Sequence, residues 1–183
     1  MDHASIGDAA EKMLEYVEND STFMTDKVMT VPTESYTDPD QWGAEIELVF
    51  KRVPLMLALS CEMPNPGDYK AMDAVGMPVL ISRNKAGEVS AFLNVCSHRG
   101  APVAAEGHGN CARFTCKYHG WTYGADGKLV GIADRAKFGE IDKSMRGLRQ
   151  LPCAEKNGMI FVCLTPDAPI DVDAYYGAML DDY

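Results

Sequence analysis

Two short segments of this chain each offer one thiol and one imidazole at close spacing. Residues 96–100 read CSHRG and contain Cys96 and His98, and residues 116–121 read CKYHGW and contain Cys116 and His119. Two thiolates on one iron and two imidazoles on the other are the ligand set of one class of [2Fe–2S] cluster. The spacing therefore predicts such a cluster, with each segment contributing a ligand to both irons.

This ligand set has an electronic consequence. Replacing two thiolates by two neutral imidazoles changes the formal charge of the oxidised site from about −2 to about 0, so an added electron is accepted more easily. Cys96 and Cys116 are expected to hold an iron that stays ferric, while His98 and His119 bind the iron that changes valence. Each imidazole keeps one nitrogen free to hydrogen-bond to an acceptor or to lose a proton.

The same four side chains suggest a second kind of site, a structural zinc. Zinc fingers usually group like ligands, with C-x2–4-C followed by H-x3–5-H, whereas here each segment mixes Cys with His. A zinc-stabilised interaction module is thus the less favoured alternative. The two remaining histidines, His3 at the terminus and His108 between glycines, are expected to be solvated loop residues.

The segments that flank these ligands carry a family resemblance. Residues 92–100 (FLNVCSHRG) and 114–123 (FTCKYHGWTY) resemble the N-terminal Rieske [2Fe–2S] domain of the α (large) subunit of Rieske non-haem iron ring-hydroxylating oxygenases. Respiratory Rieske proteins carry an extra Cys in each loop and a Ser after the second Gly. Ala101, Tyr118 and Trp121 stand at those places here, so the resemblance is to the oxygenases.

The resemblance implies a function and its partners. It assigns a Rieske [2Fe–2S] cofactor to Cys96, His98, Cys116 and His119, with one-electron transfer as the activity. A ferredoxin or flavin-dependent reductase would donate the electrons, and the acceptor would be an oxygenase catalytic domain, on a neighbouring subunit of a homo-oligomer. Such oxygenases serve aromatic hydrocarbon catabolism. The alternative is a stand-alone Rieske-type ferredoxin, an electron carrier rather than part of an enzyme.

The catalytic iron of these oxygenases is expected to be missing from this chain. A mononuclear iron of this kind is bound by two His and one carboxylate. Once His98 and His119 are assigned to the cluster, the sequence offers no second His pair, so we expect no mononuclear iron here and assign no catalytic residue. Whether this chain alone is an enzyme stays open, and the substrate is not indicated.

Charge is divided unevenly along the chain, whose formal net charge is −10. Residues 1–45 hold eleven acidic and two basic residues, residues 166–183 hold five acidic and none basic, and residues 46–165 hold fifteen basic and eleven acidic. The positive middle part suits an acidic redox donor, unless its lysines only solvate loops. Without a basic stripe interleaved with aromatic residues, nucleic acid is not expected as a partner. Without a long apolar run or a secretory leader, we expect a cytoplasmic protein and no membrane.

Hydrophobic spacing predicts an all-β fold with helical attachments. Apolar residues recur at helical intervals near the N-terminus, and Asp38 followed by Pro39 predicts the start of a second helix. Short strands are predicted at 55–59, 69–72, 79–82, 88–95, 148–154 and 159–164, and a further helix at 171–183. We expect an antiparallel β-sandwich with a small cluster-binding subdomain. Its boundaries are a helical N-terminal arm at 1–45, a Rieske domain at 46–165 with cluster loops 96–100 and 116–121, and a linker with the start of a helix at 166–183.

The four other cysteines lie in or beside apolar, strand-like runs. In a reducing compartment such residues are usually buried free thiols. That is the expectation for Cys61, Cys111, Cys153 and Cys163.

Overall fold

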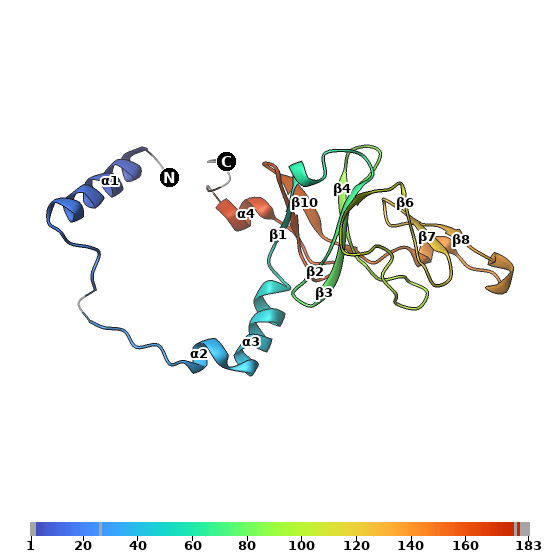
Figure 1. Cartoon of the computed structure of the whole chain (residues 1–183), viewed down its shortest axis with the longest axis horizontal. Helices are drawn as coiled ribbons and strands as arrows, with labels where there is room; N and C mark the ends of the chain where they lie inside the picture. Colours follow the sequence, from blue (N-terminus) through green and yellow to red (C-terminus); the bar gives the residue numbers. More distant parts are fainter. Residues whose placement is uncertain (1–2, 26, 178, 180–183) are drawn as a thin grey trace.

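The computed structural model describes residues 3–25, 27–177 and 179. Figure 1 shows a β-domain with a helical arm extending from one side. The helices are α1 (His3–Glu18), α2 (Glu34–Thr37), α3 (Pro39–Glu45) and α4 (Val172–Tyr176), with a π-helical turn at Ile46–Phe50 and 3₁₀ turns at Ser60–Glu62, Arg135–Lys137 and Lys143–Arg146. The strands are β1 (Leu55–Leu59), β2 (Asp68–Ala74), β3 (Met77–Arg83), β4 (Val89–Leu93), β5 (Gly107–Asn110), β6 (Arg113–Thr115), β7 (Trp121–Gly124), β8 (Leu129–Ile132), β9 (Gln150–Leu151), β10 (Cys153–Lys156) and β11 (Met159–Val162).

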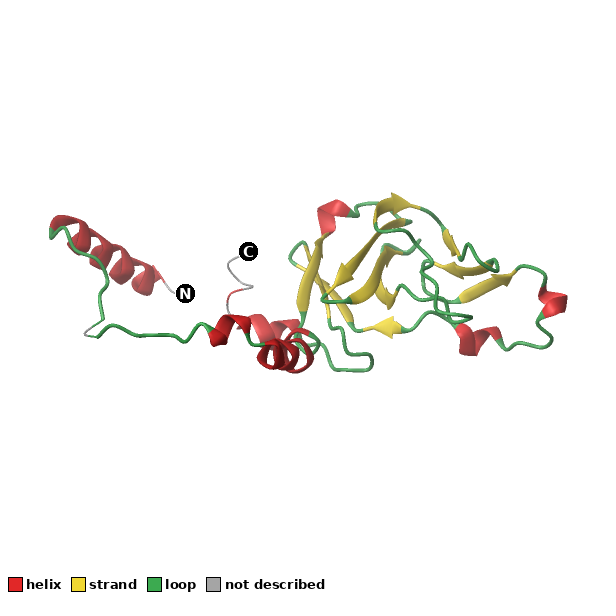
Figure 2. Cartoon of the chain, turned by 60° about the horizontal axis from the view of Figure 1, so that its bottom comes forward, coloured by secondary structure: helices red, strands yellow, loops and turns green. Residues whose placement is uncertain are grey.

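The strands form antiparallel sheets. One has the order β1-β11-β10, a second has the order β5-β2-β3-β4-β9, and a third, β6-β7-β8, forms a separate small unit. Figure 2 shows the small sheet at the end of the domain that lies away from the arm. The predicted antiparallel β fold is confirmed, and the small sheet carries one of the two predicted cluster loops.

Strand β3 connects two hydrophobic cores. Val79 and Ile81 belong to the core between the two larger sheets, whereas Leu80 belongs to the core that also contains Cys96 and Cys116. Successive side chains of a strand point to opposite faces, so a strand buried on both sides supplies both cores in turn. The core below the cluster loops is therefore continuous with the central sheet.

Some strands differ from the sequence-based expectation. The predicted strand 148–154 is two strands, because Pro152 interrupts it: β9 joins the central sheet and β10 pairs with β11. Proline has no N–H to donate to a strand ladder. Because the chain changes sheets at Pro152, neither ladder has to accommodate the missing donor. His108, expected in a loop, lies in β5, where it is exposed and its Nε2 is 3.5 Å from Glu62.

The arm is helical as expected, and its apolar side chains are largely exposed. Asp38 caps α3 by accepting hydrogen bonds from the N–H groups of Asp40 and Gln41, as its sequence suggests. Yet Trp42 is 57% exposed, and α2, α3 and the π-helical turn contain no buried residue among those described. Amphipathic spacing predicts a helix but not the surface that its apolar face will meet.

The cysteines outside the cluster loops have varied environments. All are free thiols; Cys163 is buried, Cys111 and Cys153 are half-buried, and Cys61 is exposed in the 3₁₀ turn after β1. The expectation of burial is therefore wrong for Cys61, because the apolar run ends one residue before that turn begins. The predicted C-terminal helix is present as α4, while residues 178 and 180–183 of that prediction lie outside the described residues.

Candidate metal centre

The two loops that carry the candidate ligands share one backbone design. In the first, the N–H of Gly100 donates to the carbonyl of Cys96 at 2.9 Å, and the N–H of Cys96 donates to the carbonyl of Ala101 at 2.8 Å. The second loop repeats both bonds at the same spacings: the N–H of Gly120 donates to the carbonyl of Cys116 at 3.0 Å, and the N–H of Cys116 donates to the carbonyl of Trp121 at 2.8 Å. Equal loops of six residues therefore hold both cysteines, although the histidine stands two residues after Cys in one and three after Cys in the other.

Glycine closes each loop for a conformational reason. Gly100 and Gly120 have φ of +80° and +64°, a region that other residues adopt at a cost. Gly120 has a second constraint, because a Cβ built on it would lie 2.6 Å from the Cβ of Ala133. The tight return of both loops depends on these two residues.

The loops bring the four predicted ligand residues to one cavity. It has a volume of about 370 Å³ and is lined by Cys96, His98, Cys116 and His119 together with neighbours in the same loops. Both cysteines are buried, at 2% and 3% exposure, while both histidines are half-buried. The two imidazole rings lie 4.7 Å apart between centroids and are nearly perpendicular.

The donors fit a binuclear iron–sulfur cluster. Such a cluster asks for only two protein ligands per iron, because inorganic sulfide supplies the others. Two thiols toward the core and two imidazoles toward solvent match that division. Over the part of the chain that the structure describes, no three side chains of the His, Cys, Asp and Glu types gather as they would around a single ion.

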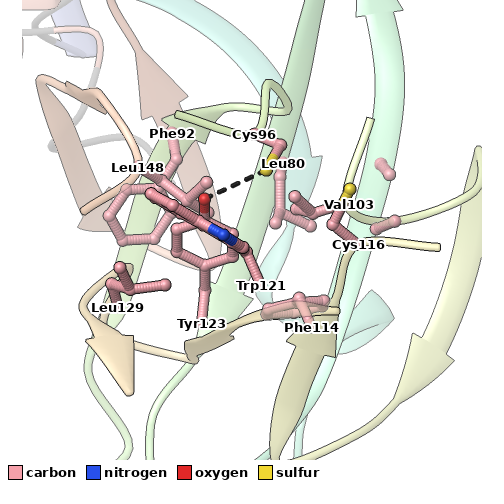
Figure 3. Close-up of a cluster of buried hydrophobic side chains, with 12 residues drawn as sticks. Leu80, Phe92, Cys96, Val103, Phe114, Cys116, Trp121, Tyr123, Leu129 and Leu148 are labelled. Carbon is pink, nitrogen blue, oxygen red and sulfur yellow. Dashed lines mark hydrogen bonds between the residues drawn. The ribbon is translucent and has the colours of Figure 1, made fainter. Parts of the chain in front are cut away.

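A hydrogen-bond network lies behind Cys96. The hydroxyl of Tyr123 is 3.2 Å from Cys96 Sγ, and Figure 3 shows this contact within the buried core. Tyr123 Oη also accepts from the N–H of Ser97 at 3.1 Å and lies 3.0 Å from Ser97 Oγ. Ser97 Oγ in turn donates to the carbonyl of Arg146 at 2.6 Å. The network ties the first ligand loop to the segment before β9.

The proton of Tyr123 is held firmly in this network. Burial, followed by the hydrogen bond to Cys96, raises the pKa of Tyr123 to about 12. The side chain is therefore a neutral donor at physiological pH. Since Ser97 Oγ already donates to a carbonyl, the Tyr123 proton can go to Cys96 Sγ or to the lone pairs of Ser97 Oγ.

Asn94 fixes the other end of the first loop. Its buried side chain donates to the carbonyl of Ala104 at 2.9 Å and accepts from the N–H groups of Val103 and Ala104 at 3.0 and 3.1 Å. One amide thus closes the segment that contains Cys96 and His98. Because these backbone groups are buried, they need such partners.

The mouth of the cavity is positively charged. Arg99 and Lys117 lie within the ligand loops and are exposed, as is Tyr118. Desolvation, followed by the nearby charges of His119 and Arg99, lowers the pKa of His98. The environment therefore favours the neutral imidazole, the form that binds a metal.

Sequence reasoning identified the four residues at the cavity but not all of their supports. Sequence alone did not predict the network from Tyr123 through Ser97 to Arg146 or the Asn94 bonds. It also did not predict the edge-to-face contact of Phe138 with His98, whose ring centroids lie 5.2 Å apart. Asn94 and Tyr123 stand inside the quoted motif, so their polar character among apolar neighbours was an available signal. Phe138 had none, because it lies nineteen residues beyond His119 in an irregular segment.

Comparison with known proteins agrees with this geometry. The model of the Rieske [2Fe-2S] domain family matches residues 53–152. The chain belongs to this family. Its cofactor is a Rieske-type [2Fe–2S] cluster, which supersedes the zinc alternative. The matched range contains both ligand loops and all strands from β1 to β9.

The relatives of this Rieske domain are large subunits of oxygenases. The anthranilate 1,2-dioxygenase large subunit of Acinetobacter baylyi is 34% identical over 153 residues, which are 83% of this chain and 32% of that protein. The chlorobenzene dioxygenase subunit alpha of a Cupriavidus species is 39% identical over 143 residues, 78% of this chain and 32% of that protein. The chain thus spans about a third of the curated relatives it matches.

Solved structures show the same relationship. Naphthalene 1,2-dioxygenase from a Rhodococcus species superposes with a TM-score of 0.75 and 33% identity, over 93% of this chain and 37% of that one. A quaternary ammonium Rieske monooxygenase superposes with a TM-score of 0.76 and 28% identity, over 84% of this chain and 42% of that one. This Rieske domain therefore corresponds to the electron-accepting part of oxygenase α subunits. No helix among its described residues is long and apolar enough to cross a membrane.

Proposed function

We propose that this chain accepts single electrons through a Rieske [2Fe–2S] cluster held by Cys96, His98, Cys116 and His119, and passes them to the catalytic iron of a Rieske oxygenase. The observation that carries the proposal is the cavity in which the two imidazoles meet at 4.7 Å in front of two buried thiols. When bound, the cluster supplies a reversible one-electron couple.

The side chains of the chain divide the work around that couple. The buried cysteines face the hydrophobic core, where the hydroxyl of Tyr123 lies 3.2 Å from Cys96 Sγ. The half-buried histidines lie on the solvent side of the cavity, so a ring nitrogen that is not used for metal would be available to a partner. Electrons would therefore enter and leave by the histidine side.

The partners follow from this exposed side. The positive residues at the cavity mouth support an acidic ferredoxin or flavin reductase as donor. For the acceptor, the monooxygenase structure compared above is described in terms of inter-subunit electron transfer. We extend that arrangement to this chain: the acceptor is the catalytic domain of a neighbouring subunit, and the full-length protein is a homo-oligomer. A cytoplasmic location suits such reductases.

The expected division of the chain belongs to the same proposal. Residues 1–45 form an arm, residues 46–165 the Rieske domain, and residues 166–183 a linker that leads into a following helix. The exposed arm supports this division. The aromatic and quaternary ammonium compounds in the relatives' names differ in chemistry, so the proposal does not extend to the substrate.

Ligand substitutions test the cluster assignment. Cys96→Ser and His119→Ala should each abolish cluster assembly, because each removes one of two protein ligands from an iron. His108→Ala is the matched control: it removes an exposed histidine of β5 and should leave iron and acid-labile sulfide near two equivalents per chain. Normal iron and sulfide in the Cys96→Ser and His119→Ala proteins, or their loss in the control, would contradict the assignment.

Ionic strength tests the docking side. Reduction by an acidic ferredoxin should slow as salt rises, because the screening length at about 0.15 M is only about 8 Å. Lys117→Glu should lower the bimolecular rate in stopped-flow experiments while the cluster remains. Lys85→Glu, in the hairpin between β3 and β4 at the opposite end of β4 from the ligand loop, should have little effect. A rate independent of salt, or equal effects of both reversals, would remove the argument for this docking side.

A further inference from the structure

The imidazole of His98 is surrounded by aromatic rings. Trp121 stacks on it with a centroid distance of 5.0 Å and an interplanar angle of 12°. Phe138 meets it edge to face at 5.2 Å and 84°, and Phe138 also lies 5.9 Å from the ring of Trp121. His119, the other candidate ligand, makes ring contacts with His98 and Tyr118 and no ring contact with Phe138 or Trp121 among the described residues.

Trp121 is a fixed support. It begins β7, is 3% exposed, and its carbonyl accepts the bond from the N–H of Cys116 that closes the second ligand loop. The position of Trp121 is thus set by the second ligand loop, of which it is the last residue. Phe138 reaches His98 from a different part of the chain.

Phe138 is held against the site by its own segment. It ends the 3₁₀ turn at Arg135–Lys137, and its N–H donates to the carbonyl of Arg135 at 3.0 Å. The segment is tied to the second ligand loop through the N–H of Ala133, which donates to the carbonyl of Gly120 at 3.2 Å. Phe138 is half-buried while Lys137 beside it is exposed, so the turn directs this one side chain inward.

We propose that Phe138 is a positioning residue for His98: together with Trp121 it fixes the plane of the imidazole and shields it from water. An imidazole can rotate about its bond to Cβ, and ring contacts on two sides remove that freedom. The orientation of the ring sets the direction in which its free nitrogen meets an electron-transfer partner. The proposal rests on the assignment of His98 as a cluster ligand.

Two substitutions separate orientation from shielding. Phe138→Leu keeps an apolar cover but loses the flat ring, so the cluster should assemble while the nitrogen hyperfine couplings of one histidine, measured by pulsed EPR of the reduced protein, shift and broaden. Phe138→Ala also admits water, which stabilises the more negative reduced state, and should in addition raise the midpoint potential. Phe138→Tyr should restore the wild-type spectrum, and Lys137→Ala is the control for a general disturbance of the turn.

The outcomes distinguish this proposal from the ligand assignment. Failure of the assignment would appear as normal iron and sulfide in the His119→Ala and Cys96→Ser proteins. Failure of the positioning role would appear as unchanged couplings in a fully loaded Phe138→Leu protein. Equal changes in Lys137→Ala, or loss of iron from Phe138→Leu, would overturn it as well, since Phe138 would then serve loop folding rather than the orientation of one ring.

Discussion

The hydroxyl of Tyr123 should raise the reduction potential of the cluster, and Tyr123→Phe should lower it. The donor lies 3.2 Å from Cys96 Sγ, and both side chains are buried, at 0% and 2% exposure. A hydrogen bond to a thiolate stabilises the state that carries more negative charge on sulfur, which is the reduced one. Removing the hydroxyl therefore favours the oxidised state.

The size of the shift can be worked from the strength of the bond. A hydrogen bond to a charged group contributes about 1.5–3 kcal/mol. Only the difference between the two oxidation states affects the potential, and the added electron resides mainly on the iron bound by histidine. If a third to a half of the bond energy is differential, the change is about 0.5–1.5 kcal/mol, or about 20–65 mV for a one-electron couple.

Protein-film voltammetry of the wild-type and Tyr123→Phe proteins would measure this shift. The variant keeps the ring in the core, and iron analysis would show that it remains loaded. Ser97→Ala is the companion variant. Without the Ser97 hydroxyl, Cys96 Sγ is the remaining acceptor for the Tyr123 proton. A midpoint potential that does not change in Tyr123→Phe but rises in Ser97→Ala would refute the reasoning, by showing that the proton belongs to Ser97 in the native protein.

Three further predictions concern the supports of the site. Gly120→Ala should destabilise the fold more than Gly100→Ala. Both put alanine at a positive φ, but only Gly120→Ala places a methyl group 2.6 Å from the Cβ of Ala133. Thermal unfolding with iron analysis would show the order, and equal losses of stability would contradict it. Asn94→Ala should cost about 2–4 kcal/mol in denaturant unfolding, since three buried backbone groups lose their partner, and a cost below about 1 kcal/mol would be inconsistent with that count. Glu155→Gln should cost about 2 kcal/mol at neutral pH, because it breaks a bidentate pair with the buried Arg83. The Arg83 hydrogen bond lowers the pKa of Glu155 below its usual 4.5, so this contribution is present above that pH and is lost as the pH falls through the folded-state pKa; a difference between the two proteins that grows on acidification would be the wrong sign.

The sequence indicated which two loops would meet at the cavity, because the signals in those loops are local. Cys96 and His98 lie two residues apart, and the glycine that closes each loop lies within two residues of the histidine, so residue type and spacing contain most of the geometry. The antiparallel fold was likewise visible in short apolar runs separated by turn residues. The split of strand 148–154 was also readable in principle, because Pro152 marks the place where a ladder bond is missing.

The parts that escaped prediction depend on contacts between distant segments. Phe138 meets His98 across forty residues, and nothing in its immediate neighbours distinguishes it from other apolar loop residues. The same holds for the arm. Helical spacing near Trp42 identifies an apolar face but not the surface that this face contacts. In the described chain Trp42 is exposed.

The strand shared by the two cores, β3, bears on how such proteins can be recombined. Leu80 packs in the core below the ligand loops, while Val79 and Ile81 pack in the core between the larger sheets. One strand must therefore fit two packing environments at once. A cluster-binding unit transplanted from a distant relative would pack against β3 side chains that had been selected to fit a different unit. Functional chimaeras should therefore exchange β3 and the small sheet together, and the inheritance of redox properties should follow this joint block rather than the ligand loops alone.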